Sequence, residues 1–566
     1  MQRSPYFTGG LPGPARSREP AGVALILLLT GLFLAGKPPP GEARPMPQRN
    51  IHAAAASGAG PSSPRPNVLL FISDDQTWVT FSRALMPRVF AHLVDRGVLF
   101  ERSYVNTSLC CPSRAEILTG LYEHHTGVDQ NNMKLTRPNI VEGLSDLGYR
   151  TLLAGKYLQA EDCEPTPEYD TWVCSNFQPY EDPLLNVNGE WIQFQGYTTD
   201  ILADFTVDFI ATTPPNQPFF AMYSPKSPHL PGNDDRCDDL PVEPFRPPSF
   251  DEDTEASGKP QHMRRPPLTS EEIADIDKDH ERMTQAVQCL DPAVGTILDS
   301  LGRRERNTLV LYLSDNGYLY GEHRATGKQW PYEESVRVPF VVRYPPLISG
   351  AAAFVSQALV QNVDIAPTIA ELAGIEWHAD GRSIIPLLSG EAGSIREGAL
   401  LEHCQADHFP CAGKLPSFDG LATGRYKYVE YSTEEAELYD LASDPFELAN
   451  VAGNPDWVET EAELAALLAT VRAAPPTDTT IVTGPRGVQE DGGPFAFSYF
   501  SQSRFATYDC RLRTGGVPGP WFGCDGESTT IGPLDPEKYV FEVKGTDEFG
   551  LLDRSPAKRS FTVPTT

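Results

Sequence analysis

The sequence predicts an α/β fold whose central sheet is largely parallel. Short apolar runs alternate with longer helix-like segments, which is typical of that class. The run PNVLLFIS at residues 66–73 is apolar almost throughout, as expected for a strand buried on both faces. A second run of the same kind, NTLVLYLS, occupies residues 307–314. We therefore expect one large α/β region at residues 66–390.

The segments between these two runs continue the alternation. Gly148, for example, is a helix stop that feeds directly into the strand-like YRTLLAGK. The expected helices are 86–97, one that opens near Cys110, 139–148 and 271–302, and the expected strands are 98–105, 149–156 and 219–224.

The pattern changes after residue 390. Short strand-like segments such as GLATGRYKYVEYS and AELYDL precede a closing helix at residues 455–473. They predict a smaller antiparallel subdomain at residues 391–473, packed on the first region. A linker is expected at residues 474–480.

The last part of the chain, residues 481–566, is predicted to be a small immunoglobulin-like β-sandwich. The segments PFAFSYF, FATYDCRL and KYVFEVKGTD read as strands separated by Gly and Pro turns. In the last of them, aromatic and aliphatic residues alternate with charged ones. The simplest role is a spacer or stabilising module, and the alternative is a carbohydrate contact through Trp521 and Phe522.

The composition limits the kind of partner. A chain of 566 residues is too long for one hydrophobic core, so several domains are expected. The 46 Lys and Arg residues stand against 76 Asp and Glu residues, a formal net charge of −30. This acidity argues against general binding to nucleic acid or anionic membranes. An anionic substrate would need a local positive pocket.

The N-terminus resembles a secretion signal. Arginines precede an apolar run at residues 21–36, and small residues follow a Pro-rich break. We predict a signal peptide at 1–43 and a flexible linker at 44–65, with an uncleaved membrane anchor as the second choice. The mature protein is therefore expected to be secreted or otherwise extracytoplasmic, where disulfides persist.

Ten cysteines suit such a compartment. Sequence proximity suggests the pairs Cys163–Cys174, Cys404–Cys411 and Cys510–Cys524, with Cys237–Cys289 as a fourth. Only the adjacent Cys110 and Cys111 remain. For these two, a vicinal disulfide, a redox pair or two buried thiols are the structural alternatives to a catalytic role.

Oxygen-rich residues follow the two buried strands. Asp74 and Asp75 come after the first, and Asp315 and Asn316 after the second. Ligands bind at the carboxyl ends of strands in open α/β sheets, and these side chains suit Ca²⁺ or Mg²⁺. Either pair alone could instead be a helix cap or a turn.

The two cysteines stand at a predicted helix start. Pro112 suits the first turn of a helix, where free N–H groups favour an anion. Cys110 and Arg114 are four residues apart and would share one helix face. The guanidinium could then reach an oxyanion held at Cys110.

The string CCPSRAEILTG, with PNVLLFISDDQ before it and LSDNG, GEHRATGKQWPYEESVRVPFVVRYP and NVDIAPTIAELAG after it, resembles the sulfatase family of the alkaline phosphatase superfamily. The resemblance spans about residues 66–450 and implies an alkaline-phosphatase-like α/β fold. CCPSR and AGKYL are similar to the N-acetylglucosamine-6-sulfatase branch. In the family, CxPSR directs oxidation of its first cysteine to Cα-formylglycine, made by a formylglycine-generating system.

The resemblance also implies roles for individual residues. Cys110, as formylglycine, would touch a cation, Ca²⁺ in most members, bound by Asp74, Asp75, Asp315 and Asn316. The hydrated aldehyde would attack sulfur and later expel sulfate. Positive side chains would hold the sulfate, and a histidine would protonate the leaving oxygen. These residues are Arg114, Lys156, Lys328 and His229.

One departure concerns the segment after Lys156. Many sulfatases have GKWHLG where this chain has GKYLQA, so Leu158 stands near the place of a histidine. His323 is one candidate to replace it as the base that collapses the hemiacetal. His124 and His125 would either line the pocket rim or form a solvated pair.

The expected function is hydrolysis of sulfate monoesters on a sugar, such as N-acetylglucosamine-6-sulfate, or on an aryl alcohol. Phosphate or phosphonate ester hydrolysis on the same scaffold is the alternative among enzymes. A noncatalytic cell-surface or glycan-binding protein is the alternative outside enzymes, but the intact metal pairs and CxPSR argue against it.

Overall fold

The computed structural model describes residues 65–564 with internal gaps at 159–162, 176–178, 232–234, 238–240, 349–352, 376, 378, 405–414, 473–478, 490–491, 501–506, 525, 527 and 547–556. The predicted signal peptide (1–43) and almost all of the predicted linker (44–65) lie outside the described residues, as does most of the linker at 474–480. Within the described part, no helix has both the length and the apolar character needed to cross a bilayer.

A ten-stranded mixed sheet forms the centre of the molecule, in the order β12-β2-β11-β8-β1-β7-β3-β4-β5-β6. The five neighbours from β8 to β4 are parallel, as predicted, whereas β11, β5 and β6 pair antiparallel. The strands are β1 (Asn67–Ser73), β2 (Val98–Tyr104), β3 (Arg150–Gly155), β4 (Thr171–Cys174), β5 (Leu184–Val187), β6 (Glu190–Gln193), β7 (Phe219–Ser224), β8 (Thr308–Ser314), β11 (Phe340–Arg343) and β12 (Phe354–Gln361).

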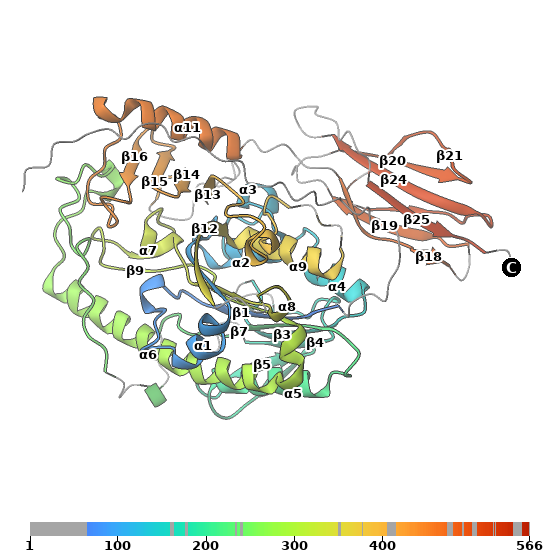
Figure 1. Cartoon of the computed structure of the whole chain (residues 1–566), viewed down its shortest axis with the longest axis horizontal. Helices are drawn as coiled ribbons and strands as arrows, with labels where there is room; N and C mark the ends of the chain where they lie inside the picture. Colours follow the sequence, from blue (N-terminus) through green and yellow to red (C-terminus); the bar gives the residue numbers. More distant parts are fainter. Residues whose placement is uncertain are drawn as a thin grey trace, which may run out of the picture. The chain divides into compact units, whose positions relative to one another are not determined.

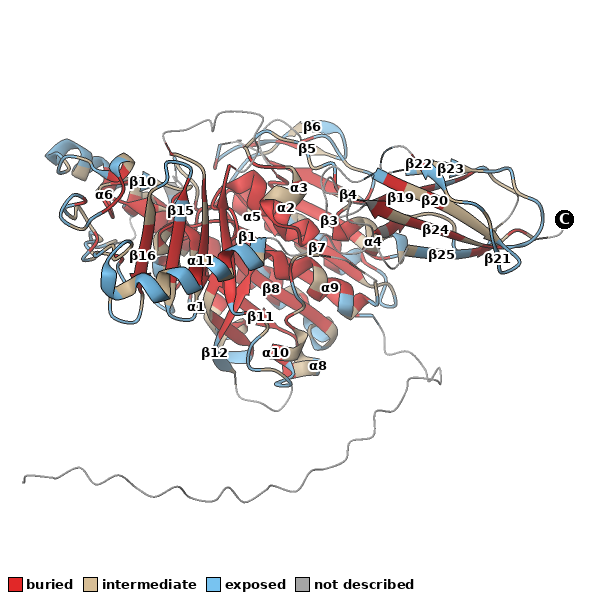
Figure 2. Ribbon diagram, turned by 90° about the horizontal axis from the view of Figure 1, so that it is seen from above, coloured by how far each residue is buried: buried red, intermediate tan, exposed pale blue. Residues whose placement is uncertain are grey.

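Helices cover both faces of this sheet, which is why its central strands are apolar throughout (Figure 1). One hydrophobic cluster joins one sheet face to α2 (Cys110–Thr119), α4 (Ile140–Asp146) and α9 (Ile365–Ala373). Another joins the opposite face to α1 (Pro87–His92), α5 (Thr198–Thr212) and α6 (Ser270–Ser300). The sequence patterns did not predict α5. Figure 2 shows the strands β1, β7 and β8 and the helix α2 as buried.

Shorter elements connect this core. They are α3 (Glu123–Thr126), α7 (Glu333–Val336), α8 (Pro345–Ile348), α10 (Ile385–Leu388) and the hairpin of β9 (Leu319–Tyr320) and β10 (Thr326–Gly327). The smaller antiparallel sheet that we predicted follows them, in the order β13-β14-β15-β16, with the helix α11 packed on it. Its elements are β13 (Gly398–His403), β14 (Phe418–Thr423), β15 (Tyr426–Tyr431), β16 (Ala436–Asp440) and α11 (Val458–Arg472).

The C-terminal part forms two sheets with one shared hydrophobic core, so the predicted β-sandwich is confirmed as an architecture. The rings of Phe497 and Phe541 stack in that core with centroids 4.0 Å apart. The immunoglobulin-like assignment stays a prediction. One sheet has β17 (Thr480–Thr483), β19 (Phe495–Phe500) and β23 (Ser528–Ile531), and the other has β18 (Gly487–Val488), β25 (Ala557–Thr562), β24 (Lys538–Thr546), β20 (Thr507–Thr514), β21 (Val517–Pro518) and β22 (Phe522–Cys524).

Three of the four predicted disulfides are present in the described structure. Cys163–Cys174, Cys237–Cys289 and Cys510–Cys524 are bonded. The fourth predicted pair, Cys404–Cys411, includes Cys411, which lies outside the described residues. Cys110 and Cys111 are buried free thiols, as expected for the two cysteines left outside the four predicted pairs. A vicinal disulfide is thereby excluded.

Candidate active site

The carboxyl ends of β1 and β8 bring four oxygen-bearing side chains together. The two strands pair in parallel with Ser73 opposite Ser314, so the residues that follow each strand leave the sheet at the same edge. The Asp75 amide donates to Asp315 Oδ1 (3.1 Å), and Asn316 Nδ2 donates to Asp75 Oδ1 (2.7 Å). The helix-cap alternative for Asp75 is wrong, because the next helical turn begins at Trp78 with Thr77 as its N-cap.

The neighbouring strands supply two cationic or basic groups. Lys156 follows β3, and its buried ammonium donates to Asp74 Oδ2 (2.7 Å). The loop after β7 returns to the same edge and places His229 Nε2 3.6 Å from Asp75 Oδ2. His229 is partly exposed, whereas the two aspartates are buried.

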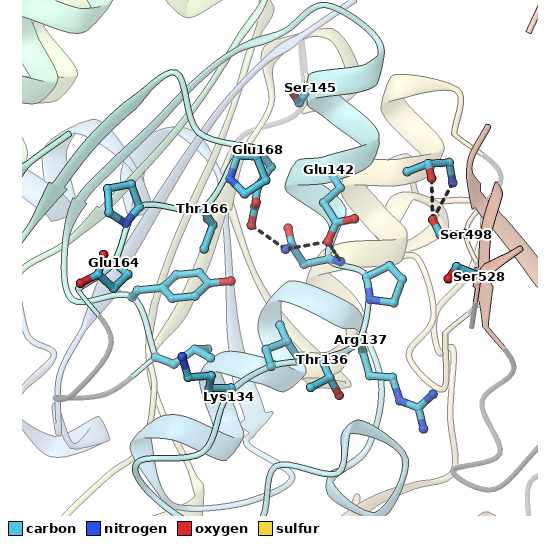
Figure 3. Close-up of a pocket in the computed structure, with 18 of the residues that line it drawn as sticks. Lys134, Thr136, Arg137, Glu142, Ser145, Glu164, Thr166, Glu168, Ser498 and Ser528 are labelled. Carbon is cyan, nitrogen blue, oxygen red and sulfur yellow. Dashed lines mark hydrogen bonds between the residues drawn. The ribbon is translucent and has the colours of Figure 1, made fainter. Parts of the chain in front are cut away.

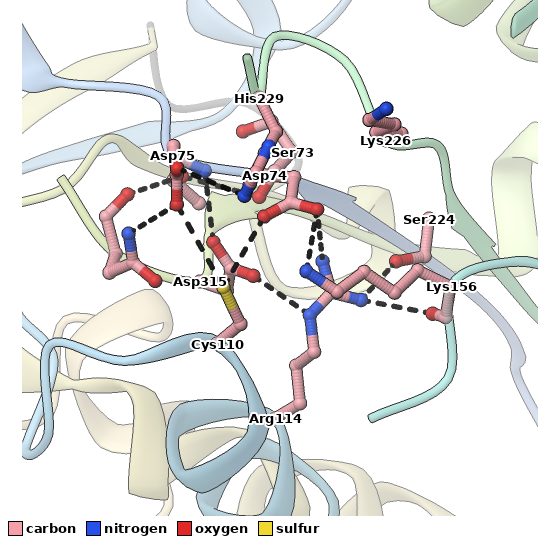
Figure 4. A network of polar contacts seen from close by, with 12 residues as sticks. Ser73, Asp74, Asp75, Cys110, Arg114, Lys156, Ser224, Lys226, His229 and Asp315 are labelled. Carbon is pink, nitrogen blue, oxygen red and sulfur yellow. Dashed lines mark hydrogen bonds and ion pairs between the residues drawn. The ribbon is translucent and has the colours of Figure 1, made fainter. Parts of the chain in front are cut away.

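The helix α2 directs Cys110 into this group of side chains, as Figure 4 shows. Its Sγ lies 3.6 Å from Asp74 Oδ1 and 3.9 Å from Asp75 Oδ1. Lys328, which follows β10, places its Nζ 2.7 Å from the same sulfur and also contacts Asp75. Cys111 points away, with its Sγ 3.3 Å from the carbonyl of Met133.

Arg114 lies one helical turn after Cys110 and is completely buried. Its Nε donates to Asp315 Oδ2 (2.8 Å), and its Nη1 donates to Ser224 Oγ (2.6 Å) and to the carbonyl of Lys156 (2.9 Å). Its Nη2 has no hydrogen-bond partner among the described residues and lies 3.9 Å from Asp74 Oδ2. One donor of the guanidinium is thus available for an oxyanion.

Burial and charge set the protonation of this centre. Burial raises the pKa of the Cys110 thiol to about 12, although Lys156 and Lys328 act in the opposite direction. Burial also disfavours ionisation of Asp74, but the positive groups around it, Lys156 first, hold the pKa of this carboxyl well below its usual range. Burial lowers the pKa of Lys328, but the acidic groups around it, Asp75 first, together outweigh burial and hold this pKa well above its usual value. At neutral pH both lysines are charged, and the unmodified thiol is protonated and a poor nucleophile.

The donor set suits a hard divalent cation. Three buried carboxylates meet at this edge, and the Oδ1 of Asn316 is buried without a hydrogen-bond partner in the described structure. Oxygen ligands of this kind are those that Ca²⁺ and Mg²⁺ take. Asp74, Asp75, Cys110 and His229 have ligand atoms within 4.8 Å of one another.

The structure therefore brings nine of the predicted side chains together: Asp74, Asp75, Cys110, Arg114, Lys156, His229, Asp315, Asn316 and Lys328. Sequence reasoning missed Ser224, which orients Arg114, and Lys226, which lies in the same loop as His229 and packs over Tyr180. Lys226 was identifiable only by its place three residues before His229.

The other residues considered in the sequence lie outside the group around Cys110. The buried ring of His323 bonds to Glu252 and lies 3.7 Å from Glu334, so its described contacts join it to another cluster and not to Cys110. Leu158 is buried in the hydrophobic cluster beside α2. His124 and His125 are not a solvated pair, because each contacts a buried carboxylate, Glu402 and Asp380 respectively.

A separate cavity of about 690 Å³ lies beside the segments 132–139 and 164–168 (Figure 3). Asn139 Nδ2 donates to Glu142 (3.2 Å) and Glu168 (2.9 Å) in its wall. Its lining has four carboxylates and two cationic side chains and includes none of the nine side chains that converge at Cys110. This charge balance does not favour a sulfate group, so we place the ester chemistry at Cys110.

Comparisons with known proteins agree with this geometry. The Sulfatase family model matches residues 66–375, more than half of the chain, and a model of the C-terminal part of N-sulphoglucosamine sulphohydrolase matches residues 321–474. N-acetylglucosamine-6-sulfatase of Capra hircus is 28% identical over 462 residues, covering 71% of this chain and 82% of that protein. N-acetylglucosamine-6-O-sulfatase of Bacteroides thetaiotaomicron is 26% identical over 494 residues, with 74% and 88% covered.

A solved structure supports the same relationship. BT4656, in complex with its substrate D-glucosamine-2-N,6-O-disulfate, superposes with a TM-score of 0.61 at 25% identity, over 72% of this chain and 98% of that one. The family match, the fold and the convergence of residues around Cys110 lead to one conclusion: the chain belongs to the sulfatase family and is a sulfuric ester hydrolase.

Proposed function

We propose that this sulfatase removes the 6-O-sulfate of N-acetylglucosamine or a closely related glucosamine unit, with Cys110 converted to Cα-formylglycine. The observation that carries the proposal is the position of Cys110 Sγ, which lies 3.6 Å from Asp74 Oδ1, 3.9 Å from Asp75 Oδ1 and 2.7 Å from Lys328 Nζ. The sugar assignment is supported by the names of the relatives and by the substrate in the BT4656 complex.

The conversion replaces the protonated thiol with an aldehyde whose hydrate supplies a hydroxyl nucleophile and, on the same carbon, the hydroxyl that releases sulfate. Lys328 is 2.7 Å from the sulfur and would stabilise negative charge at that carbon. Cys111 is directed to Met133 and takes no part.

The sulfate oxygens would be held by three cations. Arg114 offers its unpartnered Nη2, while Lys156 contacts Asp74 and Lys328 contacts Asp75. Their positive charge compensates for the acidity of the chain at the one place where an anion must enter. His229 is the partly exposed group of the set, so it can reach the leaving sugar oxygen and donate a proton to it.

Asp74, Asp75, Asp315 and Asn316 would hold a divalent cation, Ca²⁺ in our proposal, with Mg²⁺ as the alternative. When bound, the cation polarises the sulfate oxygens and stabilises negative charge on the nucleophile. Arg114 keeps Asp315 in place from the opposite side through its Nε.

We further propose that the enzyme is exported through the signal peptide at residues 1–43 and meets a formylglycine-generating system during maturation. The described disulfides support an oxidising compartment.

Sulfate release from N-acetylglucosamine-6-sulfate, compared with its 3-sulfate isomer and with p-nitrophenyl sulfate and phosphate, tests the proposal. We expect the highest kcat/KM for the 6-sulfate, no sulfate release by Cys110→Ala, and wild-type release by the matched Cys111→Ala variant. Activity retained by Cys110→Ala would refute the mechanism. A higher kcat/KM for phosphate would instead favour a phosphate or phosphonate ester hydrolase, and equal rates for the two isomers would refute the sugar assignment.

A further inference from the structure

The outer face of the larger sheet in the C-terminal sandwich carries an unusual group of charges. Core residues such as Phe541 and Val543 point inward, so the alternate residues of β20, β24 and β25 point outward. Arg511 stands opposite Glu542, and Glu542 stands opposite Lys558. We call Arg511, Arg513, Lys544, Lys558 and Trp521 the cationic face.

The cationic face carries more positive charge than its acidic neighbours can neutralise. The Glu542 side chain is 0% exposed, and three cations surround it. Arg511 bonds to it directly, Lys558 lies 3.5 Å away and Arg513 3.8 Å away. One carboxylate cannot neutralise three cations. The Nε of Arg513 is also buried without a hydrogen-bond partner in the described structure, whereas the Lys558 side chain is 58% exposed.

A tryptophan covers the other end of the face. Arg511 and Lys544 lie 4.2 Å and 4.6 Å from the centroid of the Trp521 ring. Trp521 is itself only half-buried, so part of its ring stays exposed beside the two cations. Lys544 has one acidic neighbour, Asp509, at 3.8 Å. The result is a flat aromatic surface beside a surplus of cations.

The surplus of positive charge on the cationic face contrasts with the acidity of the whole chain. Its formal net charge is −30, yet residues 481–566 contain nine Lys and Arg against eleven Asp and Glu. The sandwich is therefore nearly neutral, and four of its nine cations lie on the cationic face. No residue of this face belongs to the group around Cys110, so a contact here is separate from catalysis.

We propose that the cationic face binds a sulfated polysaccharide and holds the polymer on which the catalytic site acts. Sulfate groups would complete the neutralisation of Arg513 and Lys558, and the exposed part of the Trp521 ring would contact a sugar ring. An extended sheet surface suits a chain with repeated anionic groups better than a single small anion. The proposal rests on the assignment of sulfated sugars as substrates but not on the formylglycine mechanism.

Binding of the full-length protein to dextran sulfate, to neutral dextran and to polyglutamate at several salt concentrations tests it. We expect wild-type protein to bind dextran sulfate and neither of the other polymers. Arg513→Gln/Lys558→Gln should bind at least about tenfold more weakly, with a log Kd against log salt slope shallower by about 2. Trp521→Ala should weaken binding several-fold without changing the slope, since it removes no charge.

The matched control is Arg303→Gln/Arg306→Gln, which removes two exposed cations from the catalytic region. It should bind like the wild type. All variants should keep the wild-type kcat/KM on p-nitrophenyl sulfate, which separates a failed binding face from a failed enzyme, and should unfold at the wild-type temperature. Unchanged binding by the Arg513/Lys558 variant, an equal loss in the control, or equal wild-type binding to polyglutamate would each overturn the proposal.

Discussion

Glu116 lies on α2, the helix that carries Cys110 and Arg114, and it is completely buried. Its Oε2 accepts hydrogen bonds from Asn362 Nδ2 (2.6 Å) and the amide of Thr107 (3.3 Å). Its Oε1 has no partner among the described residues. Burial raises the pKa of this carboxyl from 4.5 to about 8. We predict that Glu116→Gln changes the pH dependence of stability in a defined direction.

The protonation of Glu116 in the folded and unfolded states sets how the free energy of unfolding changes with pH. Between pH 4.5 and about 8 the folded protein keeps a proton on Glu116 that the unfolded chain has lost. The stabilisation by this proton is complete below pH 4.5 and is lost as the pH rises to about 8, by about 1.4 kcal/mol per pH unit and about 5 kcal/mol in all. Glutamine does not ionise, but its amide group lacks an acceptor, which costs about 1–2 kcal/mol. The variant should therefore be less stable near pH 4 and more stable, by about 3 kcal/mol, above pH 8.

Thermal unfolding from pH 4 to pH 9 measures this difference. The difference in Tm between variant and wild type should change sign across the range, by several degrees in total. Glu371→Gln, which makes the same substitution at an exposed glutamate on α9, is the matched control and should keep the Tm close to that of the wild type. A constant Tm difference for Glu116→Gln would refute the reasoning.

Three further changes test other parts of the structure. Lys328→Met removes the cation beside Cys110 and should lower kcat for p-nitrophenyl sulfate by about 100-fold or more; a loss of less than about threefold would exclude the proposed role. Asn316→Ala removes the unpartnered oxygen and should weaken Ca²⁺ binding about tenfold in calorimetry, whereas unchanged affinity would remove Asn316 from the ligand set. Cys510→Ser/Cys524→Ser should destabilise the sandwich by about 3 kcal/mol in thermal unfolding and leave kcat/KM unchanged; an unchanged unfolding profile would contradict this.

The parts of the site that follow strand ends could be predicted from the sequence. A buried parallel strand has a strong apolar signature, and its carboxyl end lies at a known edge of the sheet, so Asp74 and Asp315 could be placed together without coordinates. The adjacent Cys110 and Cys111 became informative because six of the other cysteines could be paired by proximity and the remaining two, Cys237 and Cys289, formed a possible fourth pair.

Contacts between distant side chains could not be predicted. Ser224 orients Arg114 across the sheet, but a serine at the end of a strand has no distinguishing pattern. The helix α2 is buried all round, so periodicity could not show that Glu116 is a buried acid. The sequence around His323 resembles a family motif and so predicts an available base, whereas the hydrogen-bond partner of this ring, Glu252, lies 71 residues away.

The central claim is that Cys110 is a formylglycine in the working enzyme. Trypsin releases the peptide 103–114, which contains both Cys110 and Cys111. After reduction and alkylation of the active enzyme, mass spectrometry should find this peptide with one alkyl group, on Cys111, and with an aldehyde in place of the Cys110 thiol. Two alkylated cysteines in protein that releases sulfate would contradict the account.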